Sequence, residues 1–337
     1  MKRLLLVAVL VVVGGSLFAQ TIPNFAAFQS AIQSFASGTA SALPLETSVG
    51  LNWSDAYIGQ FPHFGLGLTV GAATLPYSAI KGAISTFQGG GAPNIPSNLG
   101  FLQNLGIPVP AYTIDLRIGG FVLPFDIGLK FSYISPNSLN ISNFSADYLL
   151  LGGDVRYALV KDSGFAPGIS VGIGYTYMRG NVSIPQVLNG NPTIQNVSFG
   201  GTTYAIQFQN PSLNFFWNSN VIDLKVQLSK NLFIITPFIG LGASFGISNA
   251  GGGMQSAILL NGVAPTQTQL NQMNSALGTN YTTANQTFAV TAGANGFATR
   301  VFGGFSFNLF ILKIGLGAEY EFLSGSFAGM VNARIQF

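Results

Sequence analysis

Residues 310–322 read FILKIGLGAEYEF, and their side chains alternate between two kinds. The even-numbered positions carry Phe, Leu, Ile, Leu, Ala, Tyr and Phe, whereas the odd-numbered positions include Lys, two Gly and two Glu. Because successive side chains of a β-strand point to opposite faces, the stretch predicts a strand with one apolar and one polar face. Such a strand suits a membrane barrel, in which one face meets lipid and the other lines the lumen.

The same alternation recurs along the chain. In residues 112–118 and 126–133 the charged side chains again fall opposite the apolar set, and eleven strands follow from this rule. Asp55, Asp147 and Arg179 break the rule, but they lie near strand ends, where a charge is tolerated. The remaining strands are predicted at 47–58, 63–73, 147–159, 167–179, 213–228, 232–247, 297–307, 310–322 and 326–337.

The composition supports a membrane barrel over a soluble or helical protein. Only 7% of the 337 residues are charged, against roughly 25% in an average soluble domain. The mean hydropathy is +0.45, yet the only apolar run that approaches the roughly 20 residues of a membrane helix is N-terminal. The 43 Gly and 29 Phe suit twisted, aromatic-rich sheets better than helices.

The first nineteen residues have the features of a secretory signal peptide. Lys2 and Arg3 precede an apolar core, and a short Gly- and Ala-containing tract leads to expected cleavage before Gln20. We therefore expect an exported protein of the bacterial outer membrane, with membrane lipid as a partner. The absence of cysteine excludes disulfides and thiolate metal sites, and the net charge of +3 gives no basis for binding nucleic acid.

The expected fold is an all-β, transmembrane, antiparallel up-and-down barrel that occupies residues 47–337. Eleven strands conflict with the even number that bacterial barrels normally have, so we expect about 12 strands, within a range of 10–14. Three explanations stay open: residues 21–45 add a strand, the same residues form a helical plug, or the 74–110 segment crosses the lumen and the first hairpin is inverted. Helical spacing of apolar residues within 20–46 favours a plug-like or periplasmic segment.

Charged side chains recur at a similar depth on the lumen face. Asp115-Leu116-Arg117, Asp154-Val155-Arg156 and Asp223-Leu224-Lys225 each precede a predicted periplasmic turn by a few residues. We expect a belt in the lower lumen with cross-strand pairing, which either braces the wall or filters solutes. Its members are Asp115, Arg117, Asp126, Lys130, Asp154, Arg156, Asp223, Lys225, Arg300, Lys313 and Arg334.

The C-terminal strand ends on an aromatic residue. With Ile335 two positions before Phe337, it resembles the terminal β-signal by which outer-membrane barrels are recognised for insertion. The resemblance implies the barrel-insertion machinery as a partner.

The predicted outer loops differ in character. Residues 74–110 are apolar and contain two short amphipathic patterns, whereas residues 248–296 are polar and uncharged. Together with the N-terminal segment, the first loop gives an architecture similar to long-chain fatty-acid transporters of the FadL type. That likeness implies an apolar small molecule as a candidate ligand.

Catalysis is not expected, and neither is a metal or a cofactor. The single histidine, His63, lies away from any acidic cluster, and Glu319 with Glu321 on one strand is a weak metal signal. The sequence favours a passive channel or transporter for small or hydrophobic solutes. The alternative is a structural or adhesin-like surface-interaction barrel that does not transport.

Overall fold

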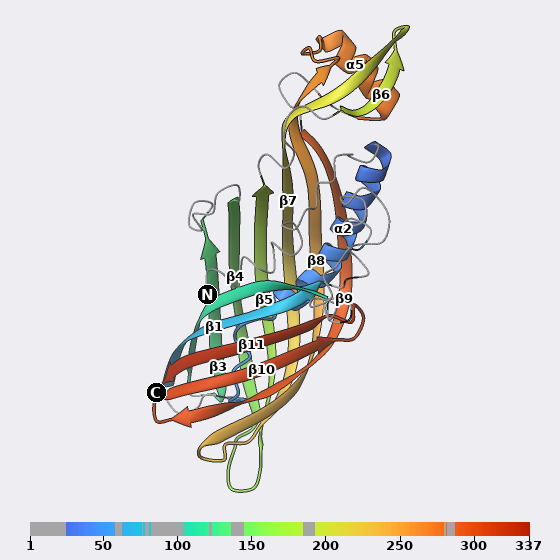
Figure 1. The fold of residues 1–337 in the computed structure, drawn as a ribbon. Helices are drawn as coiled ribbons and strands as arrows, with labels where there is room; N and C mark the ends of the chain where they lie inside the picture. Colours follow the sequence, from blue (N-terminus) through green and yellow to red (C-terminus); the bar gives the residue numbers. More distant parts are fainter. Residues whose placement is uncertain are drawn as a thin grey trace.

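The fold is a closed antiparallel β-barrel with a helix inside it (Figure 1). The structure is a computed structural model. It describes residues 25–57, 63–75, 77, 81, 104, 106–120, 123–135, 145–184, 193–279, 281 and 287–337. The strands are β1 (His63–Leu75), β2 (Ile107–Gly119), β3 (Phe125–Ile134), β4 (Ser145–Val160), β5 (Gly168–Ile184), β6 (Thr193–Phe199), β7 (Thr202–Ser229), β8 (Ile235–Leu260), β9 (Thr287–Leu309), β10 (Leu312–Glu321) and β11 (Phe327–Gln336).

Ten of these strands form the ring. Their order is β5-β4-β3-β2-β1-β11-β10-β9-β8-β7, and pairing between β5 and β7 closes it. The chain ends meet where β1 pairs with β11. Strand β6 lies outside the ring and pairs only with the start of β7.

The two ends of the barrel differ in their connections. Short turns join β2 to β3, β4 to β5, β7 to β8 and β9 to β10 at one end. Because bacterial barrels place short turns in the periplasm and longer loops outside, we call this the periplasmic end and the opposite one the outer end.

The two faces of the wall differ as the alternation predicts. Leu129 and Leu241 are 55% and 62% exposed on the outside, while Lys130 and Arg300 are buried inside. A charge facing lipid near the midplane costs about 2–4 kcal/mol. The segregation therefore identifies the exposed apolar face as the lipid face.

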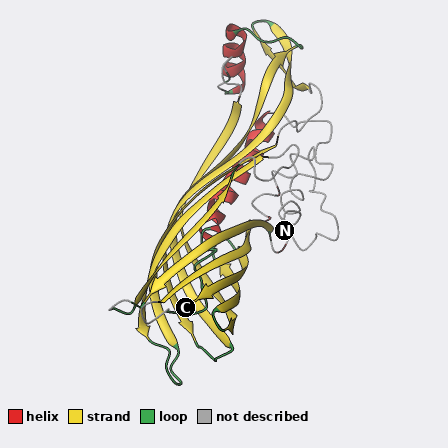
Figure 2. Cartoon of the chain, turned by 90° about the vertical axis from the view of Figure 1, so that its left-hand side faces the viewer, coloured by secondary structure: helices red, strands yellow, loops and turns green. Residues whose placement is uncertain are grey.

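The wall is much taller on one side. Strands β7 and β8 have 28 and 26 residues, against 10 in β10, and they continue beyond the ring (Figures 1 and 2). There β6 and helix α5 (Gln267–Leu277) join them in an outer lobe, which we define as residues 193–212 and 256–281. Neither β6 nor α5 is predicted by the alternation rule.

Helix α2 (Phe25–Glu46) runs inside the ring from the outer end downward (Figure 1). Residues 47–57 follow it without forming a strand. Among the described residues, no helix combines the length and the apolar character needed to cross a bilayer.

The predicted strand 47–58 is therefore wrong over residues 47–57. Removing it leaves ten strands rather than about 12, which also restores the expected even number. The ten other predicted strands are present, and β7, β8 and β9 extend well into the predicted outer loops. Most of the 74–110 loop, with most residues of its two amphipathic patterns, lies outside the described residues, as do the signal peptide and positions 20–24.

The lipid face provides a first test. Replacing Leu129, near the middle of β3, by arginine should lower the free energy of unfolding by about 2–4 kcal/mol, because the charge then faces acyl chains. Urea unfolding in lipid vesicles measures the change. Ser163→Arg in the periplasmic β4–β5 turn is the matched control, and an equal loss in both variants would contradict a lipid-facing Leu129.

Candidate functional site

Residues 25–57 occupy the lumen, and we call them the lumen plug. The outer part of α2 packs on the tall wall through small side chains. Ala36 and Ala40 contact Ala250 of β8 and Ala292 of β9, and the ring of Phe35 lies 4.9 Å from that of Phe215. The opposite face of the helix carries exposed polar side chains, namely Gln29, Ser30, Gln33, Ser34, Ser37 and Ser41.

Deeper in the barrel the helix reaches the other walls. Leu43 packs with Tyr148 and Leu150 of β4 and with Met178 of β5. Leu45 packs against Ala73 of β1 and Ala328 of β11. The last turn of α2 therefore spans the lumen and contacts walls on opposite sides.

Glu46 ends the helix as a buried carboxyl, and its Oε1 has no hydrogen-bond partner among the described residues. Burial raises the pKa of Glu46 well above its ordinary value. The C-terminus of a helix also disfavours a negative charge, so this position favours the protonated acid.

Below the helix, wall side chains bind the backbone of the plug. Lys130 donates to the carbonyls of Thr47 and Val49. Arg117 donates to the Leu51 carbonyl at 3.1 Å, and Arg156 to that of Asp55 at 2.6 Å. Charged donors on the wall thus satisfy carbonyls that have no strand partner.

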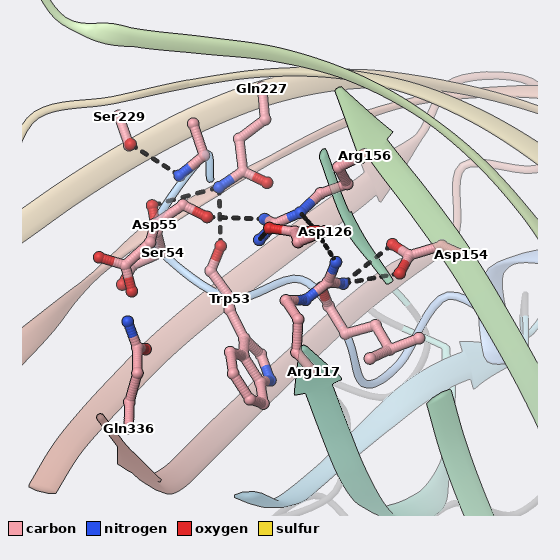
Figure 3. Close-up of polar contacts among 12 residues, drawn as sticks. Trp53, Ser54, Asp55, Arg117, Asp126, Asp154, Arg156, Gln227, Ser229 and Gln336 are labelled. Carbon is pink, nitrogen blue, oxygen red and sulfur yellow. Dashed lines mark hydrogen bonds and ion pairs between the residues drawn. The ribbon is translucent and has the colours of Figure 1, made fainter. Parts of the chain in front are cut away.

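On the β7 side most wall bonds are uncharged, and the charged one is that of Lys225, which donates to the Asn52 side chain at 3.2 Å. Gln227 donates to the carbonyls of Trp53 and Ser54 at 2.7 and 3.2 Å, and the backbone N–H of Ala56 donates to the Ser229 hydroxyl at 2.8 Å (Figure 3).

Trp53 is the largest fully buried side chain of the plug. The guanidinium groups of Arg334 and Arg117 lie 5.0 and 5.8 Å from its ring centroid, within the range of cation–π contacts. A β-carbon at Gly65 of β1 would lie 2.6 Å from the ring. Glycine at position 65 therefore provides the space in the wall that Trp53 occupies.

Asp55 forms the ionic contact between the plug and the wall. Its carboxylate accepts from Lys313 at 2.9 and 3.0 Å and from Arg334 at 2.7 Å. Burial alone would raise the pKa of Asp55, but the charges of Arg334 and Lys313 outweigh it and hold the pKa below its ordinary value. Asp55, which broke the alternation of the predicted strand 47–58, thus connects the plug to β10 and β11.

Glu319, on the same strand β10 as Lys313, makes a second contact with the plug closer to the outer end. It accepts from Ser48 at 2.6 Å and from Asn52, and it lies 3.0 Å from Nε of Arg300. Arg300 in turn pairs with Asp223 at 2.6 Å. Glu321, by contrast, accepts from the backbone of Leu323 and Ser324 in the outer turn, so the two glutamates do not share a ligand.

The remaining charges form a ladder across β2, β3, β4 and β7. Arg117 pairs with both Asp126 and Asp154. Arg156 pairs with Asp126 at 2.7 Å, and Lys225 with Asp154 at 2.6 Å. Figure 3 shows how Arg117 lies between the two carboxylates beneath the plug.

Glycines on the intervening strands make two of these pairs possible. Arg117 of β2 reaches Asp154 of β4 across Gly128 of β3. A β-carbon there would lie 2.4 Å from the Asp154 carboxylate. Gly242 of β8 lies opposite Arg300, and a β-carbon there would lie 2.7 Å from the guanidinium that reaches Asp223.

Asp115, like Lys130, bonds only to neutral groups among the described residues. It accepts from the hydroxyls of Thr69 and Thr113 and from the indole N–H of Trp53 at 3.5 Å. Asp115 therefore contacts the plug through a hydrogen bond from Trp53 and not through an ion pair.

Little free space remains around the plug. One cavity beside Trp53 offers about 10 Å³ to water, and another beside Asn52 and Lys225 about 20 Å³. A single water needs roughly 10–15 Å³ on this measure. Each of these two cavities holds about one water molecule, and most residues of 47–56 are buried, so the plug fills the lumen around them.

All eleven predicted belt residues point into the interior, and most contact one another or the plug. Sequence reasoning missed the plug's own contributions, from Ser48, Asn52, Trp53, Ser54 and Asp55, because it placed them on a wall strand. A usable signal was the acidic side chain of Asp55 on the same alternate positions as Leu51 and Trp53, where lipid would have met a charge.

The predicted β-signal residues lie on the lipid face at the seam of the barrel. Ile335 is exposed there, and the Phe337 ring lies 5.0 Å from that of Phe64 in β1. The backbone N–H of Phe337 donates to the Phe64 carbonyl at 2.9 Å.

These features define a membrane-spanning β-barrel with an internal plug. The chain belongs to the Lsa36-like family, whose sequence profile matches residues 26–337. No curated protein matches the chain significantly.

Among solved structures, the chain is similar to the transport unit of the autotransporter AIDA-I from Escherichia coli. The identity is 12%, the match covers 89% of this chain and 99% of the other, and the TM-score is 0.33. For the outer membrane protease OmpT from Escherichia coli the identity is 9%, the coverage 83% and 99%, and the TM-score 0.35. For the Ralstonia pickettii toluene transporter TbuX the identity is 10% and the TM-score is 0.25, and the match covers 86% of this chain and 90% of the other.

Asp55 offers a test of the plug contact. Asp55→Asn should lower the free energy of unfolding by about 3 kcal/mol, since Lys313 and Arg334 lose their shared counter-ion in a closed lumen. Because the folded pKa of Asp55 is depressed, its contribution is present at neutral pH and decreases as the pH falls below about 4. Urea unfolding at pH 7 and pH 3 measures both effects.

Asp147→Asn, near the outer end of β4, is the control for this test. The difference between the two variants should shrink at pH 3. A loss of stability that is equal for both variants at pH 7 would contradict an ionic contact at Asp55.

Proposed function

We propose that this protein is a plugged passage of the bacterial outer membrane, through which small polar solutes cross when the lumen plug moves. The observation that carries the proposal is the hydrogen-bonded and ionic docking of residues 47–56 in the lower lumen.

The chemistry of this docking supports movement. Lys130, Arg117, Arg156 and Gln227 bind backbone carbonyls of the plug, and water can replace a carbonyl in each of these bonds. A net protein–protein hydrogen bond is worth only about 0.5–1.5 kcal/mol, or roughly 1.5–3 kcal/mol with a charged partner. Each of these polar bonds can exchange its protein partner for water when the plug is displaced, and the apolar surface exposed at the same time is that of Val49, Leu51 and Trp53.

The lining and width of the barrel favour small polar cargo. Buried threonine, serine and charged side chains line the wall, and acidic and basic groups interleave, which gives little preference for one sign of charge. A barrel of about eight strands is filled by its own side chains, whereas the aqueous pores of porins need about 16–18 strands. Ten strands therefore leave a narrow passage once the plug is displaced.

The apolar wall and the predicted signals near both termini support a location in the outer membrane. The apolar outer face requires lipid, and the predicted signal peptide and β-signal favour export and insertion by the barrel-insertion machinery. The proposal assigns the protein no catalytic step and no cofactor.

A second candidate function is surface interaction through the outer lobe. This lobe has its own core, in which Ile206, Phe208, Ile258, Leu260 and α5 residues Leu270 and Met273 are buried. Residues 193–212 and 256–281 contain no charged side chain. An ordered, uncharged lobe held above the membrane favours contact with a partner and does not require transport.

A disulfide lock tests the passage. The hydroxyls of Ser54 in the plug and Ser306 in β9 lie 2.6 Å apart, so S54C/S306C can form a disulfide with little backbone movement. Because the natural chain has no cysteine, the new pair is the only thiol pair. Oxidised S54C/S306C should admit small polar solutes into liposomes at a rate on the order of tenfold lower than the reduced form.

The control is a disulfide that joins two strands of the wall and leaves the plug free. Ser219 of β7 and Ser248 of β8 also have hydroxyls 2.6 Å apart, and S219C/S248C should leave solute entry independent of redox state. Entry that persists with the plug locked would reject the proposed gate. A barrel silent in every state would favour the surface-interaction function.

The orientation of the barrel in the membrane gives a separate prediction. On intact cells a membrane-impermeant thiol reagent should label Gln29→Cys at the outer end of α2, and Thr202→Cys in the outer lobe. Ser163→Cys in a periplasmic turn should react only after permeabilisation. Labelling of Ser163→Cys alone on intact cells would show that the barrel is inverted.

A further inference from the structure

Three hairpin turns at the periplasmic end carry fully exposed phenylalanines. Phe165 is 105% exposed between β4 and β5, Phe233 is 89% exposed between β7 and β8, and Phe310 is 101% exposed between β9 and β10. Turns at a water-facing end are normally built from polar residues and glycine. Side chains of this size at the tips therefore need an explanation.

The three turns are neighbours around the ring. Strand β5 pairs with β7, and β8 pairs with β9, so the three hairpins form one continuous arc of six strands. We call Phe165, Phe233 and Phe310 the periplasmic arc. It lies beneath the tall wall that continues into the outer lobe (Figure 1).

Two of the three residues have backbone conformations that phenylalanine rarely adopts. The φ angles of Phe233 and Phe310 are 71° and 57°, in the region where glycine and asparagine are preferred. The side chain of Asn231 supports the first by accepting from the Phe233 N–H at 2.8 Å. A strained backbone that presents a bulky apolar side chain to the outside indicates a contact beyond the chain itself.

The turns are also fixed relative to one another. Lys230, next to the Phe233 turn, pairs with Asp162 and donates to the carbonyls of Gly164 and Ala166 at 2.7 and 3.1 Å. Asp162 also accepts from the backbone of Asn231 at 2.6 Å. These bonds hold the Phe165 and Phe233 turns side by side, so the arc is preorganised.

The arc continues the lipid-facing surface of the wall. Leu228, Ile234 and Leu309 are exposed on the strand ends and turns directly beside it. The ten residues of β10, tilted as barrel strands are, already span about 25 Å, which is the height of the apolar band. The turns beyond the strands therefore lie at the depth of the lipid headgroups, where aromatic side chains are favoured.

We propose that the periplasmic arc is a lipid-anchoring surface whose partner is the periplasmic phospholipid leaflet, into whose headgroup region Phe165, Phe233 and Phe310 insert. The anchor fixes the depth of the tall wall and hence the height of the outer lobe above the membrane. It is independent of whether the lumen plug moves.

The natural absence of cysteine allows a direct test. Single variants F165C, F233C and F310C, labelled with the polarity-sensitive fluorophore NBD, are inserted into vesicles of phosphatidylethanolamine and phosphatidylglycerol. Lipids with a nitroxide near the headgroup should quench these labels at least about threefold more than a label on Ser163→Cys, a polar position in the Phe165 turn. Aqueous iodide should show the reverse order.

Equal iodide quenching at all four positions, with no quenching by nitroxide lipid, would place the arc in water and overturn the proposal in favour of a periplasmic protein partner. If a cysteine variant fails to insert, Phe165→Trp and Phe310→Trp, compared with the parent protein in brominated lipid, give the same distinction. Additional quenching over the parent supports insertion, and none contradicts it.

Discussion

An ionisable side chain inside this barrel has no access to bulk water and cannot turn toward lipid, so it must find its partner within the lumen. The wall alone does not provide enough partners. Its lumen face carries seven cationic side chains in the belt, against six acidic ones when Glu319 and Glu321 are counted with the four belt aspartates, and Glu321 accepts from the outer turn rather than from a cation. The plug supplies what is missing, namely the carboxylate of Asp55 for Lys313 and Arg334 and the free carbonyls of residues 47–55 for Lys130, Arg117 and Arg156. Breaking a buried pair by removing one partner typically costs about 3–5 kcal/mol, so wall and plug depend on each other.

This dependence explains why the wall could be predicted from sequence and the plug could not. Alternation is a local property: each strand shows which face is polar, wherever its neighbours lie. Residues 47–55 have the same local pattern, since Val49, Leu51 and Trp53 alternate with small or polar residues. These apolar side chains are buried inside the barrel and do not face lipid. Whether such a segment joins the wall or fills the lumen depends on which strands close the ring, and no local pattern shows that. The charge of Asp55 on the same alternate positions and the odd strand count were the signs that the segment is not a wall strand.

The pattern of side chains along each strand also could not predict which charges of the belt pair with each other. That Arg117, Asp154, Asp223 and Arg300 face inward follows from alternation, but their pairing depends on the register of three strands at once. Arg117 reaches past Gly128 to Asp154, and Arg300 reaches past Gly242 to Asp223. A larger residue at either glycine would occupy the space through which the ions meet. Glycines on the polar face, which look uninformative in the sequence, are thus part of the charge network.

The two halves of the plug are held by different forces, and this decides where motion can begin. The outer half of α2 contacts the wall through apolar side chains, among them Phe35, Ala36 and Ala40, and leaves its polar face exposed. Burial of apolar side chains stabilises by about 0.8 kcal/mol for each CH₂-sized group, and this contact has no direction. Residues 47–56 are instead held by ion pairs and charge-assisted hydrogen bonds to six strands, β2, β3, β4, β7, β10 and β11. Displacement of the helix alone would leave this lower contact intact and the lumen closed, so the seal depends on the polar segment and not on the helix that precedes it.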